Sequence, residues 1–189
     1  MISIRRARPA DAVAIGAVHV AAWRSAYPGI LPDAHLARLS VTRQAAQYDH
    51  AIRTGSAAVY VAVASGLDMP TGAAPRVVGF ATAGQPRALS DSVNLTGGEI
   101  ETLYVLDDWR DRGIGRRLIR AAAAHLVEAG CRSAHVWVLS DNPSRWFYSR
   151  LGGQPVAEST TQVGGRPVQQ TAFAWDPIER LLQASPQAH

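Results

Sequence analysis

Three arginines and two glycines stand close together in the stretch RDRGIGR, from Arg110 to Arg116. An apolar, strand-like segment ends just before this stretch, and an amphipathic helical pattern begins within it. The first amides of a helix have no partner inside the helix, so together with the helix dipole they attract anions. Gly113 and Gly115 carry no side chain that would hold a ligand away from the backbone. Because the arginine guanidinium is a forked donor that suits phosphate oxygens, the stretch predicts a cradle for a pyrophosphate.

Two common phosphate-binding motifs do not fit this stretch. A P-loop would end in Gly-Lys followed by Ser or Thr, and no such sequence occurs. A dinucleotide-binding fingerprint would have a third glycine where Leu118 stands, and it would follow the first strand of the chain. The remaining alternative to a pyrophosphate cradle is a tight, arginine-rich surface turn.

The order Arg110-x-x-Gly113-x-Gly115 resembles the Q/R-x-x-G-x-G/A signature of the GNAT superfamily of N-acetyltransferases. The segment NPSRWFYSRLG, residues 142–152, resembles a second motif of that family, in which an asparagine follows a strand and a helix ends in FY-x-R/K-LG-F. Gly153 replaces the usual aromatic residue, a departure that affects packing more than chemistry.

A third segment, WRSAYPGILP at residues 23–32, resembles the first acceptor-side helix and loop of many bacterial members. The resemblance therefore covers about residues 2–175. It implies acetyl-CoA as the co-substrate and direct attack of a primary amine on its thioester. The amine would belong to a small molecule or to a protein N-terminus.

The resemblance also implies which residues bind the co-substrate. The pyrophosphate would lie on the cradle, formed by Arg110, Asp111, Arg112, Gly113, Ile114, Gly115 and Arg116. The backbone of Leu103, Tyr104 and Val105 would pair with the pantetheine arm like an added strand. The backbone N–H of Val105 would bind the acetyl carbonyl oxygen.

Transfer of the acetyl group needs a proton donor for the departing thiolate and a group that takes the proton of the amine. Tyr148 is the candidate acid, since a phenol is still protonated at neutral pH. Glu101 is the first candidate base and Glu99 the second; they lie two apart on an expected strand and so share a face. The alternative for Tyr148 is an aromatic residue of the core. The alternative for Glu99 and Glu101 is a solvated strand edge with two acidic residues.

The roles of three further residues stay open. Asn142 would bond the pantetheine, cap its own helix, or do both. Trp23 and Tyr27 lie four apart on one helix face, where they would form either the wall of the acceptor pocket or ordinary core. His19, one turn earlier, is expected on the helix surface. No spacing of His, Asp and Glu predicts a metal site.

The composition limits the possible partners and location. The charge of +4 comes entirely from arginine on the basic side, and aromatic and basic residues do not interleave, so we expect no nucleic-acid partner. The single cysteine, Cys131, excludes an internal disulfide and favours a reduced, cytoplasmic setting. No run of apolar residues approaches a membrane span, so no membrane partner is expected.

These residues require elements that bring them together. Of the 189 residues 47% are hydrophobic, enough for one domain with a real core. Periodicity predicts the order β-α-α-β-β-β-α-β-α-β-β, an α+β domain with a mixed, mostly antiparallel sheet flanked by helices. We expect this domain at residues 1–177 and a C-terminal tail at residues 178–189. The last hairpin could pair with a second copy, which predicts a homodimer.

A second class of function also fits the cradle. A domain could bind acyl-CoA and sense it without turnover. Because both a carboxylate, Glu101, and a phenol, Tyr148, are present at the expected site, catalysis is the favoured interpretation. Acceptor loops are expected at residues 27–37, 84–98 and 163–167, and composition does not give their shape.

Overall fold

Seven strands form one sheet in the order β1-β2-β3-β4-β5-β7-β6 in the computed structural model, which describes residues 1–87 and 95–185. Neighbouring strands are antiparallel except β4 and β5, which are parallel. The expected mixed, mostly antiparallel sheet is therefore confirmed. The strands are β1 (Ile2–Arg6), β2 (Ala58–Ala64), β3 (Arg76–Gly84), β4 (Gly98–Val105), β5 (Ala134–Leu139), β6 (Gln154–Val163) and β7 (Arg166–Trp175).

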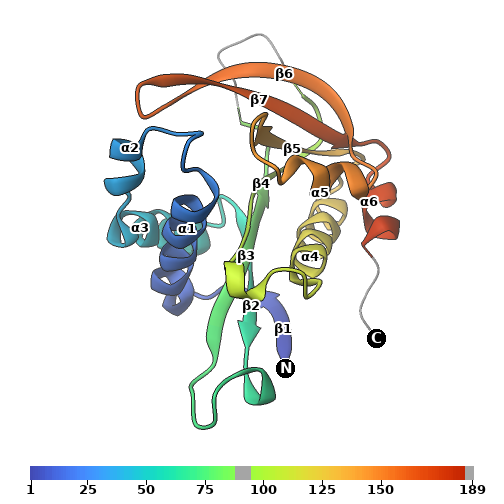
Figure 1. Cartoon of the computed structure of the whole chain (residues 1–189). Helices are drawn as coiled ribbons and strands as arrows, with labels where there is room; N and C mark the ends of the chain where they lie inside the picture. Colours follow the sequence, from blue (N-terminus) through green and yellow to red (C-terminus); the bar gives the residue numbers. More distant parts are fainter. Residues whose placement is uncertain (88–94, 186–189) are drawn as a thin grey trace.

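Helices cover both faces of the sheet (Figure 1). One face carries α1 (Ala12–Ala26), α2 (Asp33–Ala37) and α3 (Val41–Thr54), and the other carries α4 (Ile114–Glu128), α5 (Arg145–Arg150) and α6 (Glu179–Ala184). Short 3-10 helices are η1 (Pro9–Asp11), η2 (Gly66–Asp68) and η3 (Asp107–Trp109). None of the helices within the described ranges is both long and apolar enough to cross a membrane.

The second helical region of the expected order, which follows α1, consists of two helices, α2 and α3. Pro32 precedes α2, and Ser40 begins α3, where its hydroxyl accepts a hydrogen bond from the backbone N–H of Arg43 at 3.3 Å. A serine in this position satisfies one of the free amides of a helix start. The chain can therefore turn between the two helices and lay α3 against α1.

The contact between α1 and α3 depends on a glycine. A Cβ atom at Gly16 would lie 2.7 Å from the carbonyl oxygen of Val41 and 2.9 Å from the backbone nitrogen of Ala45. Because these are backbone atoms, any larger residue at position 16 would force the helices apart. The close approach buries α1 on the side of α3 as well as on the side of the sheet, and His19 lies in this contact at 7% exposure. The expectation of a surface His19 is thus wrong.

The two faces of the sheet have separate cores. A larger cluster packs α4 and α6 against the sheet and includes Leu118, Ile119 and Trp175. A smaller cluster packs α1 and α3 against the other face and includes Ile15 and Phe80. The sheet is therefore held rigidly from both sides, which fixes the strands that carry the candidate site.

The parallel pair β4 and β5 stays together only at its beginning. Its registered pairs are Gly98 with Ala134 and Glu99 with His135, and no further pair of these two strands occurs within the described residues. Beyond these pairs β4 continues along β3 and β5 continues along β7. The later halves of β4 and β5 therefore diverge and leave an open strand edge between the two halves of the sheet.

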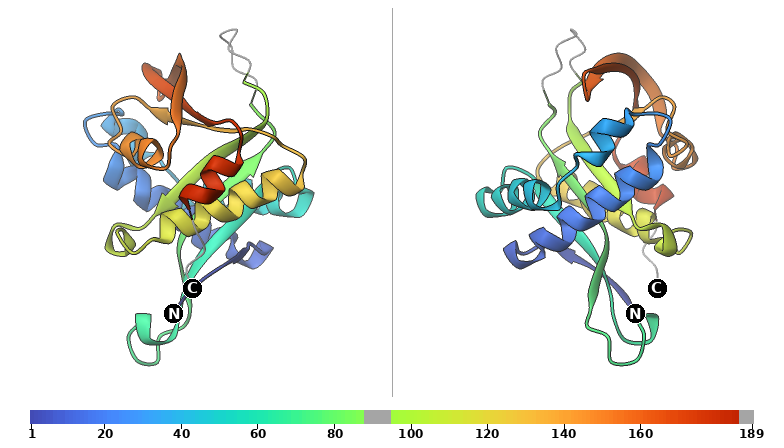
Figure 2. Two further views of the ribbon diagram at one scale, coloured as in Figure 1. Left: turned by 90° about the vertical axis from the view of Figure 1, so that its right-hand side faces the viewer. Right: turned by 60° about the vertical axis from the view of Figure 1, so that its left-hand side comes forward.

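The C-terminal segment contains a packed helix where a tail is expected. In α6, Leu181 is completely buried, as is Ile178 just before the helix. Arg120 of α4 donates to the carbonyl oxygens of Leu182 and Ser185, at 2.6 and 2.9 Å. Figure 2 shows α6 lying across α4. The segment thus contributes to the core up to residue 185; residues 186–189, like residues 88–94 of an expected acceptor loop, lie outside the described part of the chain.

Removal of the α6 anchor should destabilise the whole domain. We expect Leu181→Ala to lower the free energy of unfolding by about 2–4 kcal/mol, since a fully buried leucine leaves a cavity. The measurement is urea unfolding followed by tryptophan fluorescence and by circular dichroism. Gln183→Ala, on the exposed side of the same helix, is the control and should change stability by less than about 0.5 kcal/mol. Equal stability of the two variants would show that residues 178–189 behave as a tail.

Candidate functional site

The start of α4 presents free backbone amides. Gly113 is the N-cap with a φ of +73°, a conformation that suits glycine, and no side chain caps the helix. The first hydrogen bond into the helix runs from the N–H of Arg117 to the carbonyl oxygen of Gly113, at 3.1 Å. Within the described residues, no protein oxygen accepts a hydrogen bond from the amides of Gly115 and Arg116. These donors are available to an anion.

The arginines around the cradle fall into two groups. Arg110, Arg112 and Arg116 are exposed beside the helix start, where Arg110 also pairs with Asp107 at 2.8 Å and Arg112 covers the ring of Trp109 at 4.8 Å. By contrast, the next two arginines of α4 hold other parts of the chain: Arg117 donates to the carbonyl oxygen of Ile2, and Arg120 donates to the segment that contains α6. Only the first group can supply positive charge to a bound anion.

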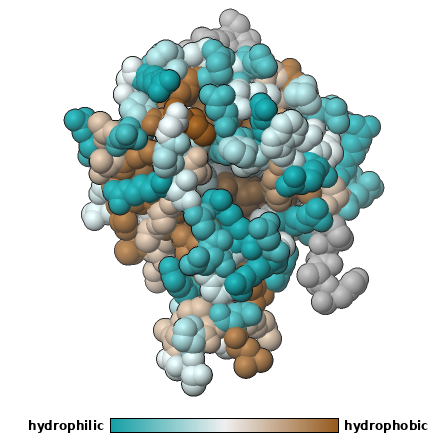
Figure 3. Space-filling model, in the orientation of Figure 1, coloured by the Kyte–Doolittle hydropathy of each residue, from teal (hydrophilic) through white to brown (hydrophobic). Residues whose placement is uncertain are grey.

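The free edge of β4 points backbone polar groups into the gap between the diverging ends of β4 and β5, which we call the opening. The N–H of Leu106 donates to Val78, at 2.9 Å, and therefore faces β3. Since successive backbone N–H groups of a strand point to opposite sides, the N–H groups of Val105 and Leu103 face away from β3, toward the gap left by β5. Figure 3 shows apolar surface recessed between hydrophilic residues near the middle of this face. The arrangement suits a ligand that lies along the strand edge and continues to the cradle.

Glu99 is completely buried, and both of its carboxylate oxygens are used by Arg87. The Nε and Nη2 atoms of Arg87 lie 2.8 and 2.6 Å from Oε1, and the backbone N–H of Arg87 donates to Oε2 at 2.7 Å. The negative charge of Glu99 is therefore balanced inside the protein. His135 lies opposite on β5, with Nε2 at 3.9 Å from Oε2 of Glu99.

Glu101 lies in a β-bulge of β4. Thr82 pairs with Thr102 and Ala83 pairs with Ile100, so Glu101 has no partner residue on β3. Such a bulge re-aims side chains and is common near active sites. Glu101 is half-buried, and its pKa is raised by burial and by the charge of Glu99, while the charge of Arg87 opposes the rise. A carboxylate with a raised pKa is suited to exchange protons near neutral pH.

Tyr148 is buried beside the opening. Its ring packs against Phe147, Phe173 and Trp175, with ring centroids 5.4, 6.3 and 6.4 Å away. Burial, and to a smaller extent the nearby Tyr27, raises the pKa of its hydroxyl well above the usual range. The phenol therefore keeps its proton at neutral pH. The same ring also contributes to the core, as the alternative interpretation has it.

Asn142 links the start of α5 to α1. Its side-chain oxygen accepts a hydrogen bond from the N–H of Ser144 at 2.9 Å, which closes an Asx turn just before α5. Its amide nitrogen donates to the hydroxyl of Tyr27 at 3.3 Å. Tyr27 is buried in a third apolar cluster with Leu31 and Leu36. Asn142 does not cap α5, since Ser144 is the N-cap of that helix and no side chain caps it. Tyr27 belongs to the core.

Aromatic rings continue from Tyr27 along α1 to His19. Trp23 meets Tyr27 edge to face at 5.0 Å and stacks on His19 at 5.1 Å. The Nδ1 atom of His19 lies 2.8 Å from the hydroxyl of Tyr48 on α3. Tyr104 of β4 adds a further edge contact to His19 at 5.4 Å. The face of the sheet covered by α1 is therefore lined by packed rings.

Three functional candidates emerge only from the structure. Arg87 stands in a polar loop, and nothing local in the sequence indicates its buried partner twelve residues later. His135 and Trp137 alternate with Val136 and Val138 on β5, and this alternation could have indicated that they share the face opposite the α4 core.

Two buried polar atoms lie without a hydrogen-bond partner among the described residues, one on α1 and one on β5. They are the indole Nε1 of Trp23 and the Nδ1 of His135. Unpaired buried polar atoms are rare in proteins. No group of three or more His, Cys, Asp and Glu side chains in the described ranges is arranged to hold a metal ion.

Comparisons with known proteins agree on one family. The model of the family described as FR47-like protein matches residues 77–162. The N-acetyltransferase YuaI of Bacillus subtilis, itself uncharacterised, is 28% identical over 96% of both chains. An aminoglycoside N(6')-acetyltransferase type 1 of Stenotrophomonas maltophilia is 34% identical over 69% of this chain and 71% of its own. The structure of yncA from Salmonella typhimurium, solved with its cofactor acetyl-CoA, superposes with a TM-score of 0.64 at 22% identity and covers 93% of each chain.

The buried His19 should make folding sensitive to acid. Burial lowers the pKa of His19 to about 4 from an ordinary value of about 6.5. Below about pH 6.5 the unfolded chain binds this proton more readily than the folded one, so stability falls as the pH drops. We expect a loss of about 2 kcal/mol from this residue between pH 7.5 and pH 5. Urea unfolding at the two pH values measures it.

The variant His19→Asn, which retains a polar group on the side of Tyr48, should lose less stability over this interval than the original chain. His50 is exposed on α3, so His50→Asn is the matched control and should keep the original pH dependence. If His19→Asn shows the same acid loss as the original chain, His19 is not the group responsible.

Proposed function

Because the chain belongs to the GNAT superfamily of N-acetyltransferases, we propose that it passes the acetyl group of acetyl-CoA directly to a primary amine of a small molecule or a peptide N-terminus. The chain is an acetyl-CoA-dependent N-acetyltransferase. What we propose is the class of amine that accepts the acetyl group and the residues that act in the transfer. One observation carries it: the amides at the start of α4 and the edge of β4 beyond Glu99 are both free of protein partners within the described residues, and the same strand carries the half-buried carboxylate of Glu101.

The residues of the opening fit the co-substrate. The amides of Gly115 and Arg116, with the exposed arginines of the cradle, would hold the pyrophosphate. The outward N–H and C=O groups of Leu103 and Val105 would pair with the amides of the pantetheine arm. Acetyl-CoA supplies a thioester whose carbonyl carbon accepts the amine and whose sulfur leaves.

The protein's own groups would handle charge and protons. The N–H of Val105 would donate to the acetyl oxygen as negative charge develops on it. Glu101 would take the proton that the amine loses, directly or through water, since burial and Glu99 raise its pKa. Glu99 is a weaker candidate for the base because both of its oxygens are already bonded to Arg87. Tyr148 would give its proton to the departing sulfur.

The acceptor side is proposed to lie between α1 and the bulge of β4. The aromatic rings that face this place support it: Trp23 stacks on His19, and Tyr104 of β4 meets His19 edge to face. The relative from Stenotrophomonas maltophilia is named for aminoglycosides, which are amines. The homodimer and the cytoplasmic location expected from the sequence stay predictions.

The test of this function is release of free thiol from acetyl-CoA in the presence of a panel of primary amines. Amine-dependent release supports transfer, whereas tight CoA binding without stimulation by any amine would indicate a sensor. Gly113→Glu should raise the KM for acetyl-CoA at least tenfold over Gly113→Ala. Both variants strain the same left-handed backbone position, which has open space around it, and only the glutamate adds a charge that repels phosphate. Equal KM values would contradict the cradle.

Tyr148→Phe should separate chemistry from binding. The change removes one hydroxyl from a packed ring, so the fold and the KM for acetyl-CoA should stay close to those of the original chain. If Tyr148 protonates the thiolate, kcat should fall by about 10²-fold. Steady-state kinetics at saturating amine measure the effect. An unchanged kcat would assign Tyr148 to the core alone.

A further inference from the structure

An exposed guanidinium is held in one position by a buried carboxylate at the acceptor side. Glu99 is 0% exposed, whereas the Arg87 side chain is 53% exposed. The bonds to Glu99 use the Nε–H and one N–H of Nη2. An arginine has five N–H donors, so three remain on the outer edge of this guanidinium. The ion pair thus presents a fixed cationic edge outside the protein core.

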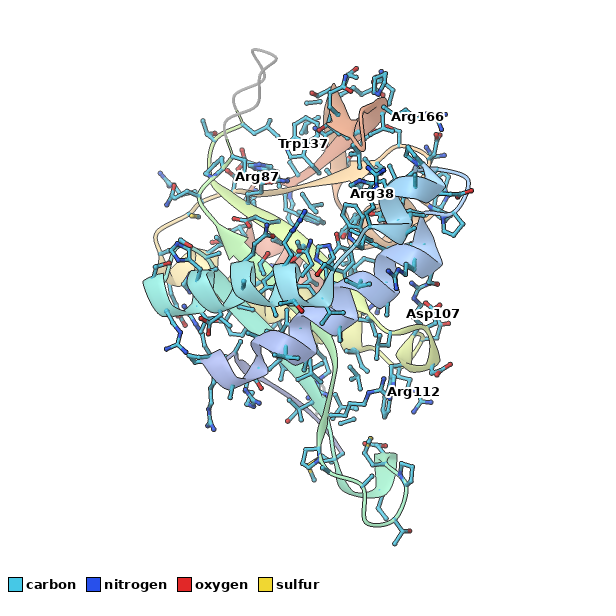
Figure 4. The ribbon with its side chains drawn as sticks, turned by 90° about the vertical axis from the view of Figure 1, so that its left-hand side faces the viewer. Arg38, Arg87, Asp107, Arg112, Trp137 and Arg166 are labelled. Atoms are coloured by element: carbon cyan, nitrogen blue, oxygen red, sulfur yellow. The ribbon has the colours of Figure 1, made fainter. Side chains whose placement is uncertain are left out.

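The fixed edge lies next to the proposed base. Glu99 and Glu101 act on each other's charge on the same face of β4, and Arg87 acts on Glu101 as well. In Figure 4, Arg87 lies on the same side of the molecule as Trp137 of β5, and two further arginines of this side are Arg38 and Arg166. Oε1 of Glu101 lies 3.3 Å from where a Cβ atom of Gly84 would stand, and Gly84 is three residues before Arg87. A molecule whose amine reaches Glu101 therefore comes close to the segment that carries this cation.

We propose that the acceptor is a compact primary amine that also carries an anionic group, a carboxylate or a phosphate, and that Arg87 binds this group. The inference rests on the proposed function and adds the chemical class of the acceptor. Arginine suits the task because its planar fork makes parallel hydrogen bonds to two oxygens of such an anion. The same edge repels a polycation, so the acceptor differs in charge from the aminoglycosides named for one relative.

The pair has a cost that the proposal explains. A carboxylate buried with an arginine is rarely more stabilising than apolar residues of the same volume. The arginine that balances this carboxylate keeps about half of its side chain exposed, at 53%. Its position fixes a charged fork that needs no reordering when an anion arrives, which favours binding.

The first experiment compares amines that differ only in the anion. Thiol release is measured for α-amino acids against their amides, and for phosphoethanolamine against ethanolamine. We expect kcat/KM to be at least tenfold higher for the anionic member of the preferred pair. Amidation lowers the pKa of the α-amine, so the amide has more of its amine in the neutral, nucleophilic form. Without the enzyme the amide would therefore react faster, and a preference for the amino acid must come from binding. The pair with the larger ratio distinguishes carboxylate from phosphate as the source of the anion.

Two results would overturn the inference: neutral amines used as well as anionic ones, or a polycationic aminoglycoside preferred over both. In either case amine-dependent thiol release still supports the proposed function. If none of the amines tested increases the release of thiol, the result counts against the proposed function itself.

The second experiment tests Arg87 directly. The double variant Arg87→Gln with Glu99→Gln removes both charges, because removing the arginine alone would leave a buried unpaired carboxylate. The ratio of kcat/KM for the anionic amine to that for its neutral analogue should fall at least tenfold. Arg76→Gln, at the exposed opposite end of β3, is the matched control and should keep the original ratio.

If the double variant does not fold, Arg87→Lys gives the same comparison, since lysine keeps the charge and loses the fork. A lowered ratio in either variant supports the role of Arg87. A ratio that stays at the original value shows that the ion pair is structural only and overturns the inference.

Discussion

The early separation of β4 and β5 is the constraint on which the rest of the structure depends. Two adjacent parallel strands would normally satisfy each other's backbone along their whole length, yet here pairing ends at Glu99 and His135. The remainder of each strand is held by its antiparallel partner on the other side, and by a helical layer on each face. The unpaired edge is thereby stable without a ligand and remains available to one.

Charge is arranged around this opening by burial. The start of α4 offers exposed arginines and free amides. Glu99 is balanced by Arg87, which leaves Glu101 as the carboxylate able to change its proton in the proposed mechanism. The phenols of Tyr104 and Tyr148 have raised pKa values, chiefly because they are buried. Proton acceptor and proton donor are therefore distinguished by environment.

Local sequence patterns predicted the helices and strands. The features that these patterns missed depend on contacts between segments that are distant in the sequence. Periodicity was sufficient for the strand order along the chain, and the glycines and arginines of the cradle indicated its chemistry. His19 was assigned to the surface because its burial depends on α3, which reaches α1 only through the backbone approach at Gly16. Arg87 gave no signal because its partner is a residue of a distant strand. The short segment of α6 was taken for a tail because the core that buries Leu181, and the bonds from Arg120, come from other parts of the chain.

Both ends of the polypeptide are fastened to the helix that opens at the cradle. Arg117 holds the first strand through Ile2, and Arg120, one turn later, holds the segment after α6. The orientation of α4 is consequently set by residues that are far from any ligand. Proteolytic trimming of either terminus, or a fusion that displaces it, would therefore weaken coenzyme affinity while every residue that touches the coenzyme stays intact.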